Sequence, residues 1–95
     1  MHLRFSAALW EYAGEGSWHF VTMPAEMSED VRAVPRPRRG FGSVRVRATV
    51  GSTVWTTSVF PSKDGTYVLP VKRSVRNAEG LEVGEPVAVG LEVLD

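Results

Sequence analysis

The sequence predicts a mainly β chain with two short helices, folded as a closed six-stranded barrel from two β-β-α-β halves. Apolar and polar residues alternate strictly over 44–50, which is typical of a strand with one buried face. Gly51-Ser52 then separates this run from a second strand at 53–61. A two-residue loop with glycine predicts a hairpin, because glycine takes the positive φ that a tight turn needs. The same order of elements also occurs twice along the chain.

The first half begins with a strand that alternation predicts over 3–10, and a second alternating run at 18–23 pairs back on it. Pro24 ends the second strand, because proline has no amide hydrogen for the sheet ladder. An apolar pair spaced four residues apart then predicts a short helix over 25–32. The segment 33–39 contains two prolines and three arginines, so we expect a basic, extended arm there.

The second half repeats this order of elements. A short strand at 66–69 is ended by Pro70, and a second helix follows, which Gly80 closes in the position that a C-terminal cap prefers. The last strand covers 87–93. The Met-Pro and Leu-Pro pairs that follow the short strands of the two halves lie 46 residues apart. Neither half could bury its apolar strand face alone, so we expect the two halves to close one barrel about a pseudo-twofold axis.

Composition predicts a single soluble domain over 1–95, with 43% hydrophobic and 23% charged residues. There is no cysteine, which excludes disulfides, thiolate metal ligands and thiol nucleophiles. No apolar run is long enough for a signal peptide or a membrane helix. We therefore expect a cytoplasmic protein that does not associate with a membrane.

The net charge is zero, but the charges are segregated along the chain. Residues 31–76 contain ten basic residues and one acid, Asp64, whereas the rest contains ten acids and one base, Arg4. Two interpretations are open. The acidic and basic segments meet in the fold and neutralise each other, or the basic segment forms a face for an anionic partner.

The second half resembles the swapped-hairpin pattern of the DNA-binding regulators and antitoxins of the AbrB type. It has a strand that ends in Leu69-Pro70, a short helix with arginine, Gly80-Leu81, a Gly-acid pair and an alternating valine strand. The whole chain is still more similar to a bacterial family of domains of unknown function, DUF1905. The motifs that carry this resemblance are Leu9-Trp10, Trp18–Pro24, Arg39–Val44, Trp55–Pro61 and Leu69–Lys72. The resemblance implies a small double-split β-barrel and assigns no activity.

The sequence contains no motif of a common catalytic or metal site. An HExxH motif, a glycine-rich phosphate loop and a nucleophile elbow are all absent. We therefore predict no catalytic residue, no metal and no cofactor. A small-molecule enzyme that uses Lys72 or His19 as a base is an alternative that no motif specifically supports.

Lys72 is the most informative charged residue. It falls in the first turn of the predicted second helix, where the helix dipole disfavours a cation by roughly 0.3–1 kcal/mol. A surface lysine tolerates this cost, but a lysine at the amino end of a helix also suits an anion. Arg76 lies one turn further on, and Arg45 and Arg47 lie on the polar face of the central strand. We expect these residues to form the basic face if an anion binds.

Large aromatic residues in a small barrel are usually part of the core, and this is what we expect for Trp10, Trp18, Trp55 and Tyr67. Both faces of the strand that carries Trp55 are apolar, however, so this strand also suits a small cleft. The candidate ligand-binding residues are therefore Arg45, Arg47, Trp55, Tyr67, Lys72 and Arg76.

These observations favour a non-enzymatic binding or interaction module with an anion-accepting basic face, whose partner is a small anion or a protein. The alternative is a nucleic-acid-binding regulator of the swapped-hairpin type, with Arg36, Arg38 and Arg39 on phosphates. Net neutrality counts against this alternative, because nucleic-acid-binding domains are usually basic. We therefore expect only weak, non-specific binding to nucleic acid. One chain supplies both halves of the barrel, so we expect a monomer.

Overall fold

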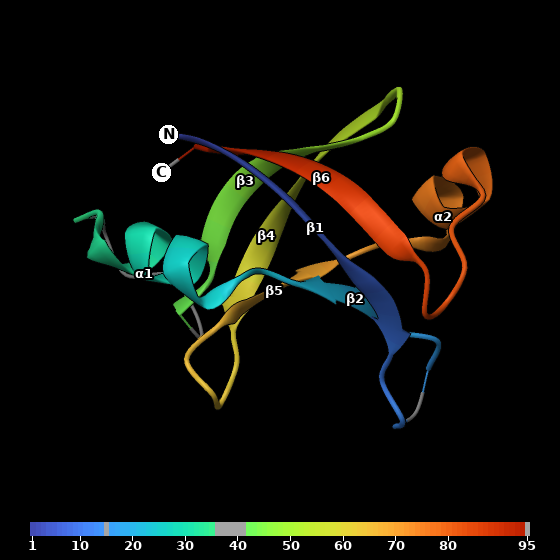
Figure 1. Cartoon of the computed structure of the whole chain (residues 1–95), viewed down its shortest axis with the longest axis horizontal. Coiled ribbons are helices and arrows are strands. Elements are labelled where there is room, and N and C mark those ends of the chain that lie inside the picture. The colour runs from blue at the N-terminus through green and yellow to red at the C-terminus, as the bar shows by residue number, and fades with distance from the viewer. Residues whose placement is uncertain (15, 36–41, 95) are drawn as a thin grey trace.

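The computed structural model describes residues 1–14, 16–35 and 42–94, and in them it shows a closed barrel of six antiparallel strands with two helices (Figure 1). The order around the barrel is β1-β2-β5-β4-β3-β6, and β6 pairs with β1 to close it. The elements are β1 His2–Glu11, β2 His19–Thr22, α1 Ala25–Ala33, β3 Val44–Val50, β4 Thr53–Pro61, β5 Tyr67–Pro70, α2 Arg73–Glu79 and β6 Pro86–Val93. The predicted fold class is confirmed.

The strands form where the sequence alternates, because one face of each strand is buried inside the barrel. In β3 the valines and Ala48 are buried, while Arg45 and Arg47 are exposed. The predicted hairpin joins β3 to β4, and Gly51 has the positive φ of 58° that its turn requires. Gly80 ends α2 in the left-handed conformation, as the sequence predicts.

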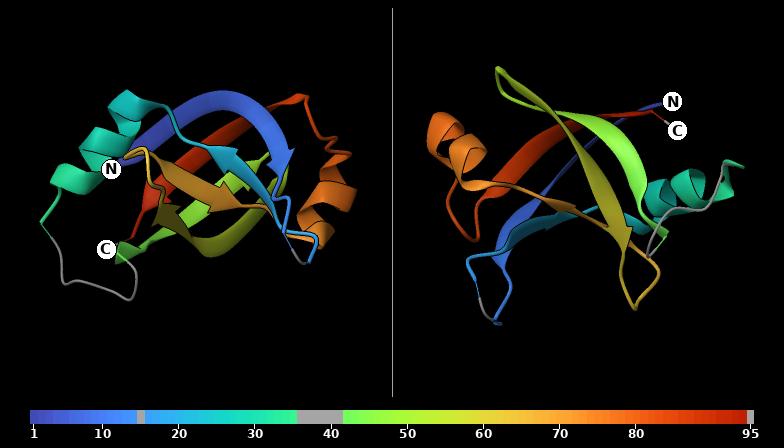
Figure 2. Two further views of the ribbon diagram at one scale, coloured as in Figure 1. Left: turned by 90° about the horizontal axis from the view of Figure 1, so that it is seen from below. Right: turned by 180° about the vertical axis from the view of Figure 1, so that it is seen from behind.

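The two halves of the chain are related by a pseudo-twofold axis. Exchanging the halves maps β1 onto β4, β2 onto β5, α1 onto α2 and β3 onto β6. Under this exchange every pair of hydrogen-bonded neighbouring strands maps onto a pair that is also hydrogen-bonded in the barrel. The axis passes between β2 and β5, which pair with each other. The two helices lie at opposite ends of the barrel (Figures 1 and 2).

Hydrogen bonds at the two ends of the β2–β5 ladder define which residues are equivalent. The Met23 amide donates to the Tyr67 carbonyl at 2.9 Å, and the Val71 amide donates to the His19 carbonyl at 2.9 Å. The exchange maps one bond onto the other, so His19 is equivalent to Tyr67 and Met23 to Val71, 48 residues apart. The first residues of α1 and α2 are also 48 residues apart.

The predicted spacing of 46 residues is therefore wrong by two. Pro24 directly precedes α1, whereas Pro70 is the last residue of β5 and is equivalent to Thr22. A proline fits inside β5 because bonded and non-bonded pairs alternate in an antiparallel ladder, and Phe20–Pro70 is a non-bonded pair. As a consequence α2 begins two residues later than the sequence indicates, and Lys72 is its N-cap rather than a residue of its first turn.

Candidate functional site

A pocket of about 390 Å³ lies at the α2 end of the barrel, and we call it the α2 pocket. It forms where β4 and β5 separate, because these strands pair only at Phe60–Val68 and Pro61–Tyr67. Residues before β2, in β4, at the end of β5 and in α2 line it. They are Ser17, Trp18, His19, Trp55, Thr56, Thr57, Phe60, Pro70, Val71, Lys72, Arg73 and Arg76.

The Arg76 guanidinium is held in place at two points. Its Nε donates to the Val71 carbonyl at 3.1 Å, and its Nη1 lies 3.5 Å from Nε2 of His19. The Nδ1 atom of His19 lies 2.8 Å from the Ser17 carbonyl, which can only accept, so Nδ1 carries the proton. Nε2 then has a free lone pair that accepts from Arg76. Arginine has five N–H donors, so the remaining donors of this fixed group can bind a ligand.

Lys72 and Arg73 add two exposed cations to the same pocket. Among the described residues that line the pocket, none is acidic. Within the described ranges the two ion pairs, Arg32–Glu29 and Arg47–Glu92, lie elsewhere. Glu79, at the end of α2, instead accepts a hydrogen bond from the Thr53 hydroxyl at 2.5 Å. The positive charge of the pocket is therefore not neutralised by a described carboxylate.

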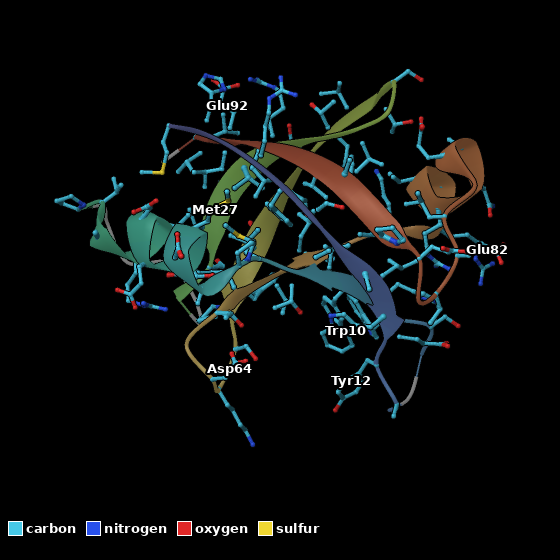
Figure 3. All side chains as sticks on the ribbon, viewed as in Figure 1. Trp10, Tyr12, Met27, Asp64, Glu82 and Glu92 are labelled. Carbon is cyan, nitrogen blue, oxygen red and sulfur yellow. The ribbon has the colours of Figure 1, made fainter. Side chains whose placement is uncertain are left out.

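The structure brings together three of the six predicted ligand-binding residues, namely Trp55, Lys72 and Arg76. Arg45 and Arg47 do not line the α2 pocket, because they lie on the outer face of β3. Arg47 is bound to Glu92 at 2.5 Å, on the outer side of the barrel (Figure 3).

Tyr67 also lies away from the α2 pocket. Its side chain is buried at the α1 end of the barrel, where the Arg32 guanidinium lies 5.7 Å from the centre of its ring. Of the candidate nucleic-acid-binding residues, Arg36, Arg38 and Arg39 lie outside the described residues. His19, the alternative candidate base, lines the pocket beside Arg76.

Sequence reasoning missed Trp18, Phe60 and Arg73 as pocket residues. Trp18 was expected in the core, but its side chain is 57% exposed and stacks on Phe20. The two residues share one face of the run 18–23, opposite His19, and both faces of that run are apolar. Alternation alone therefore does not tell which face is inside. The contact between His19 and Arg76 joins residues 57 positions apart and has no local signal.

A second hollow, of about 960 Å³, lies over the outer face of β1, β6 and β3. Gly90 and Ala88 form part of its floor, and Arg4 and Arg47 lie beside them. Across the described part of the chain, no three His, Asp or Glu side chains are placed to hold a metal ion. Neither described helix has the length and apolar character needed to span a bilayer.

The fold and the site define a small double-split β-barrel domain with one cationic, aromatic-walled pocket beside its second helix. A model of the family described as domain of unknown function, DUF1905, matches residues 5–91. The chain belongs to this family, and the resemblance seen in its motifs is confirmed. A search of curated proteins gave no match.

Proposed function

We propose that the protein binds a small organic anion with a flat apolar part in the α2 pocket. One observation carries this proposal. A guanidinium fixed at two points, that of Arg76, shares a pocket with aromatic side chains and two further cations, and none of the described residues that line the pocket is acidic. The proposal keeps the anion-accepting module that the sequence favours and moves its site to residues that the fold brings together.

Electrostatics supports an anionic ligand. Hydrogen bonds between a guanidinium and a carboxylate or phosphate are roughly twice as strong as neutral ones, and a planar fork can make two of them at once. Fixing Arg76 on Val71 and His19 lowers the conformational entropy that binding would otherwise cost. Lys72 and Arg73 are free to turn toward a ligand, since no described residue pairs with either.

The walls support a flat apolar part in the same ligand. Trp55 is buried on the inner face of β4, while Trp18 and Phe60 are 57% and 37% exposed. Exposed aromatic surface around a concave site is the usual setting for a ligand that covers it. The volume of about 390 Å³ falls in the lower part of the range of roughly 300–1,000 Å³ that is common for ligand pockets.

We place this binding module in the cytoplasm of a bacterium, acting as a monomer. The absence of cysteine and the bacterial family that the motifs resemble support this setting. The closure of the barrel within one chain supports the monomer. Light scattering at micromolar concentration should give the mass of one chain, and a stable dimer would contradict it.

The binding proposal is tested by titrating the protein with benzoate while following tryptophan fluorescence, and with indole-3-acetate by calorimetry, because the indole of that ligand fluoresces like tryptophan. We expect saturable quenching, because Trp18 and Trp55 line the pocket. Arg76→Met should weaken binding at least tenfold. Arg4→Met, which removes an exposed arginine outside the pocket, should leave binding unchanged. The proposal fails if no planar anion saturates the signal at millimolar concentration, or if both variants weaken binding equally.

A further inference from the structure

We infer that the ligand class of the α2 pocket is a nucleoside monophosphate, with its base on Trp18 and its phosphate on Arg76, Lys72 and Arg73. This inference rests on the proposed function, because it names the class of anion that the same pocket takes. Three properties of the pocket support it, and they are the number of cations, the setting of the Trp18 ring and the polar residues in the lining.

The number of cations favours a phosphate monoester over a carboxylate. Arg76, Lys72 and Arg73 line one pocket, and its described lining contains no acidic residue. A carboxylate carries one negative charge, whereas a phosphate monoester carries about −1.5 to −2 near neutral pH and has three acceptor oxygens. The fixed guanidinium suits two of these oxygens, and a lysine or a second arginine can bind the third.

The Trp18 ring is a preformed stacking platform. One of its faces is covered by Phe20, with ring centres 6.1 Å apart and planes within 10°. Phe20 in turn packs on Trp10, with ring centres 5.0 Å apart. This series of three rings holds the Trp18 indole in place while 57% of the side chain stays exposed. A flat, fixed and exposed ring is the arrangement on which proteins stack nucleobases.

Polar residues also line the pocket. Ser17, Thr56 and Thr57 each carry a hydroxyl group that can donate and accept a hydrogen bond, as ribose hydroxyls and base edges require. The pocket is also small. At about 390 Å³ it suits one nucleotide better than a dinucleotide such as a nicotinamide cofactor.

The test compares AMP with adenosine and inorganic phosphate in a fluorescence titration of the full chain, backed by calorimetry, and indole-3-acetate is measured by calorimetry alone. AMP should bind at least tenfold more tightly than adenosine or phosphate alone. Trp18→Ala should weaken the binding of AMP and of adenosine at least tenfold and leave the binding of phosphate unchanged. Tyr12→Ala, which removes an exposed aromatic residue outside the pocket, is the control and should change none of them. Arg76→Met should remove the advantage of AMP over adenosine.

The outcomes separate this inference from the proposed function. If indole-3-acetate binds and none of the four common nucleoside monophosphates does, the inference is overturned and the proposed function stands. If no anion binds, both fail. Equal losses of AMP affinity in Trp18→Ala and Tyr12→Ala would also overturn the inference. So would a single-stranded oligonucleotide that binds more tightly than AMP, because the pocket would then serve a polymer.

Discussion

The α1 end and the α2 end of the barrel share one backbone plan, and the first is filled where the second is open. Tyr67 occupies at the α1 end the place that His19 occupies at the α2 end, and Ser28 occupies the place of Arg76. Other equivalent pairs that differ include Met23 and Val71, Trp10 and Phe60, and Thr22 and Pro70. The difference between the two ends therefore lies in their side chains.

At the α1 end several of the equivalent positions are used for packing or internal hydrogen bonds. Ser28 is fully buried, and its hydroxyl accepts from the Tyr67 amide at 3.0 Å. Met23 is buried, and Met27 lies where α1 faces the barrel (Figure 3). Trp10 donates from its indole nitrogen to the Thr22 hydroxyl at 2.8 Å. These contacts stabilise the α1 end.

At the α2 end the contact between equivalent positions takes a different form. Arg76 reaches His19 at 3.5 Å through a long side chain, where Ser28 reaches Tyr67 through a short one. Val71 is shorter than Met23, and Pro70 offers Phe60 no hydrogen-bond partner such as Thr22 offers Trp10. The comparison shows that equivalent positions of a pseudo-symmetric barrel can carry different contacts, a buried hydroxyl at one end and a pocket-lining guanidinium at the other.

Met23→Ala should have the largest effect. Its side chain is 1% exposed, and deleting a buried methionine side chain costs about 2–5 kcal/mol of the free energy of unfolding. Val71→Ala, at the equivalent position, removes fewer atoms beside a pocket that is already open, so it should cost less. Urea denaturation of both variants measures the difference. An equal or larger cost for Val71→Ala would show that the two ends are packed alike.

Ser28→Ala should cost about 1–3 kcal/mol, because it leaves the buried Tyr67 amide without its acceptor. The matched control is Ser74→Ala on the exposed face of α2, which should change stability by less than about 0.5 kcal/mol. Chemical denaturation again measures both. Similar losses in the two variants would mean that the buried hydroxyl is not what closes the α1 end.

Lys72→Pro should stabilise the protein by about 0.4–1 kcal/mol, because a compatible proline restricts the unfolded chain. Lys72 and its equivalent, Pro24, have nearly the same backbone angles, φ −70° and ψ 161° against φ −57° and ψ 150°. No described residue accepts a hydrogen bond from the Lys72 amide. Thermal unfolding measures the gain.

Lys72→Ala is the control for that substitution, and it should leave stability unchanged or slightly higher in buffer without anions. An equal gain in melting temperature in both variants would show that removal of the charge, and not the proline ring, causes the effect. A substantial loss in Lys72→Ala would show that Lys72 is paired with an internal carboxylate, and the anion-binding proposal would then be dropped.

The sequence predicted most of the fold, because alternation and turn residues are local signals. The hairpin at Gly51 and the cap at Gly80 depend on neighbours in the chain and were confirmed. The limits of β3 and β4 were also confirmed, and the other four strands differ from the predicted limits by one residue at one or both ends. The candidate site was only partly predictable. The outward direction of Arg47 could be read from alternation, but its partner Glu92 lies 45 residues away on β6, and only closure of the barrel makes them neighbours.

The equivalence between residues of the two halves could not be predicted either. The proline pairs suggested an offset of 46 residues, and only the ladder hydrogen bonds showed that the offset is 48. That shift of two residues decides whether Lys72 is compared with a helical residue or with Pro24. Pairing of this kind depends on contacts across the β2–β5 ladder, and no sequence pattern in either strand specifies it.

The smallest expected effect concerns Asp64, in the turn before β5 at the α1 end (Figure 3). Its carboxylate accepts from the Thr66 hydroxyl at 2.6 Å and from the Thr66 amide at 3.0 Å, and these bonds hold the pKa of Asp64 below its ordinary value. A carboxyl with a lowered pKa in the folded state adds stability that is complete above the unfolded pKa. This contribution is lost as the pH falls through the folded pKa.

Asp64→Asn cannot titrate, so its melting temperature should lie slightly below that of the native chain at neutral pH, and the gap should close in acid. The group is fully exposed, which keeps the effect small. Asp30→Asn on α1 is the control, because no hydrogen bond to its carboxylate is found among the described residues. A gap that stays constant from neutral pH to acid would mean that Asp64 supports the turn through the shape of its side chain and not through its charge. The turn that leads into Tyr67 would then contribute nothing pH-dependent to the filled end of the barrel.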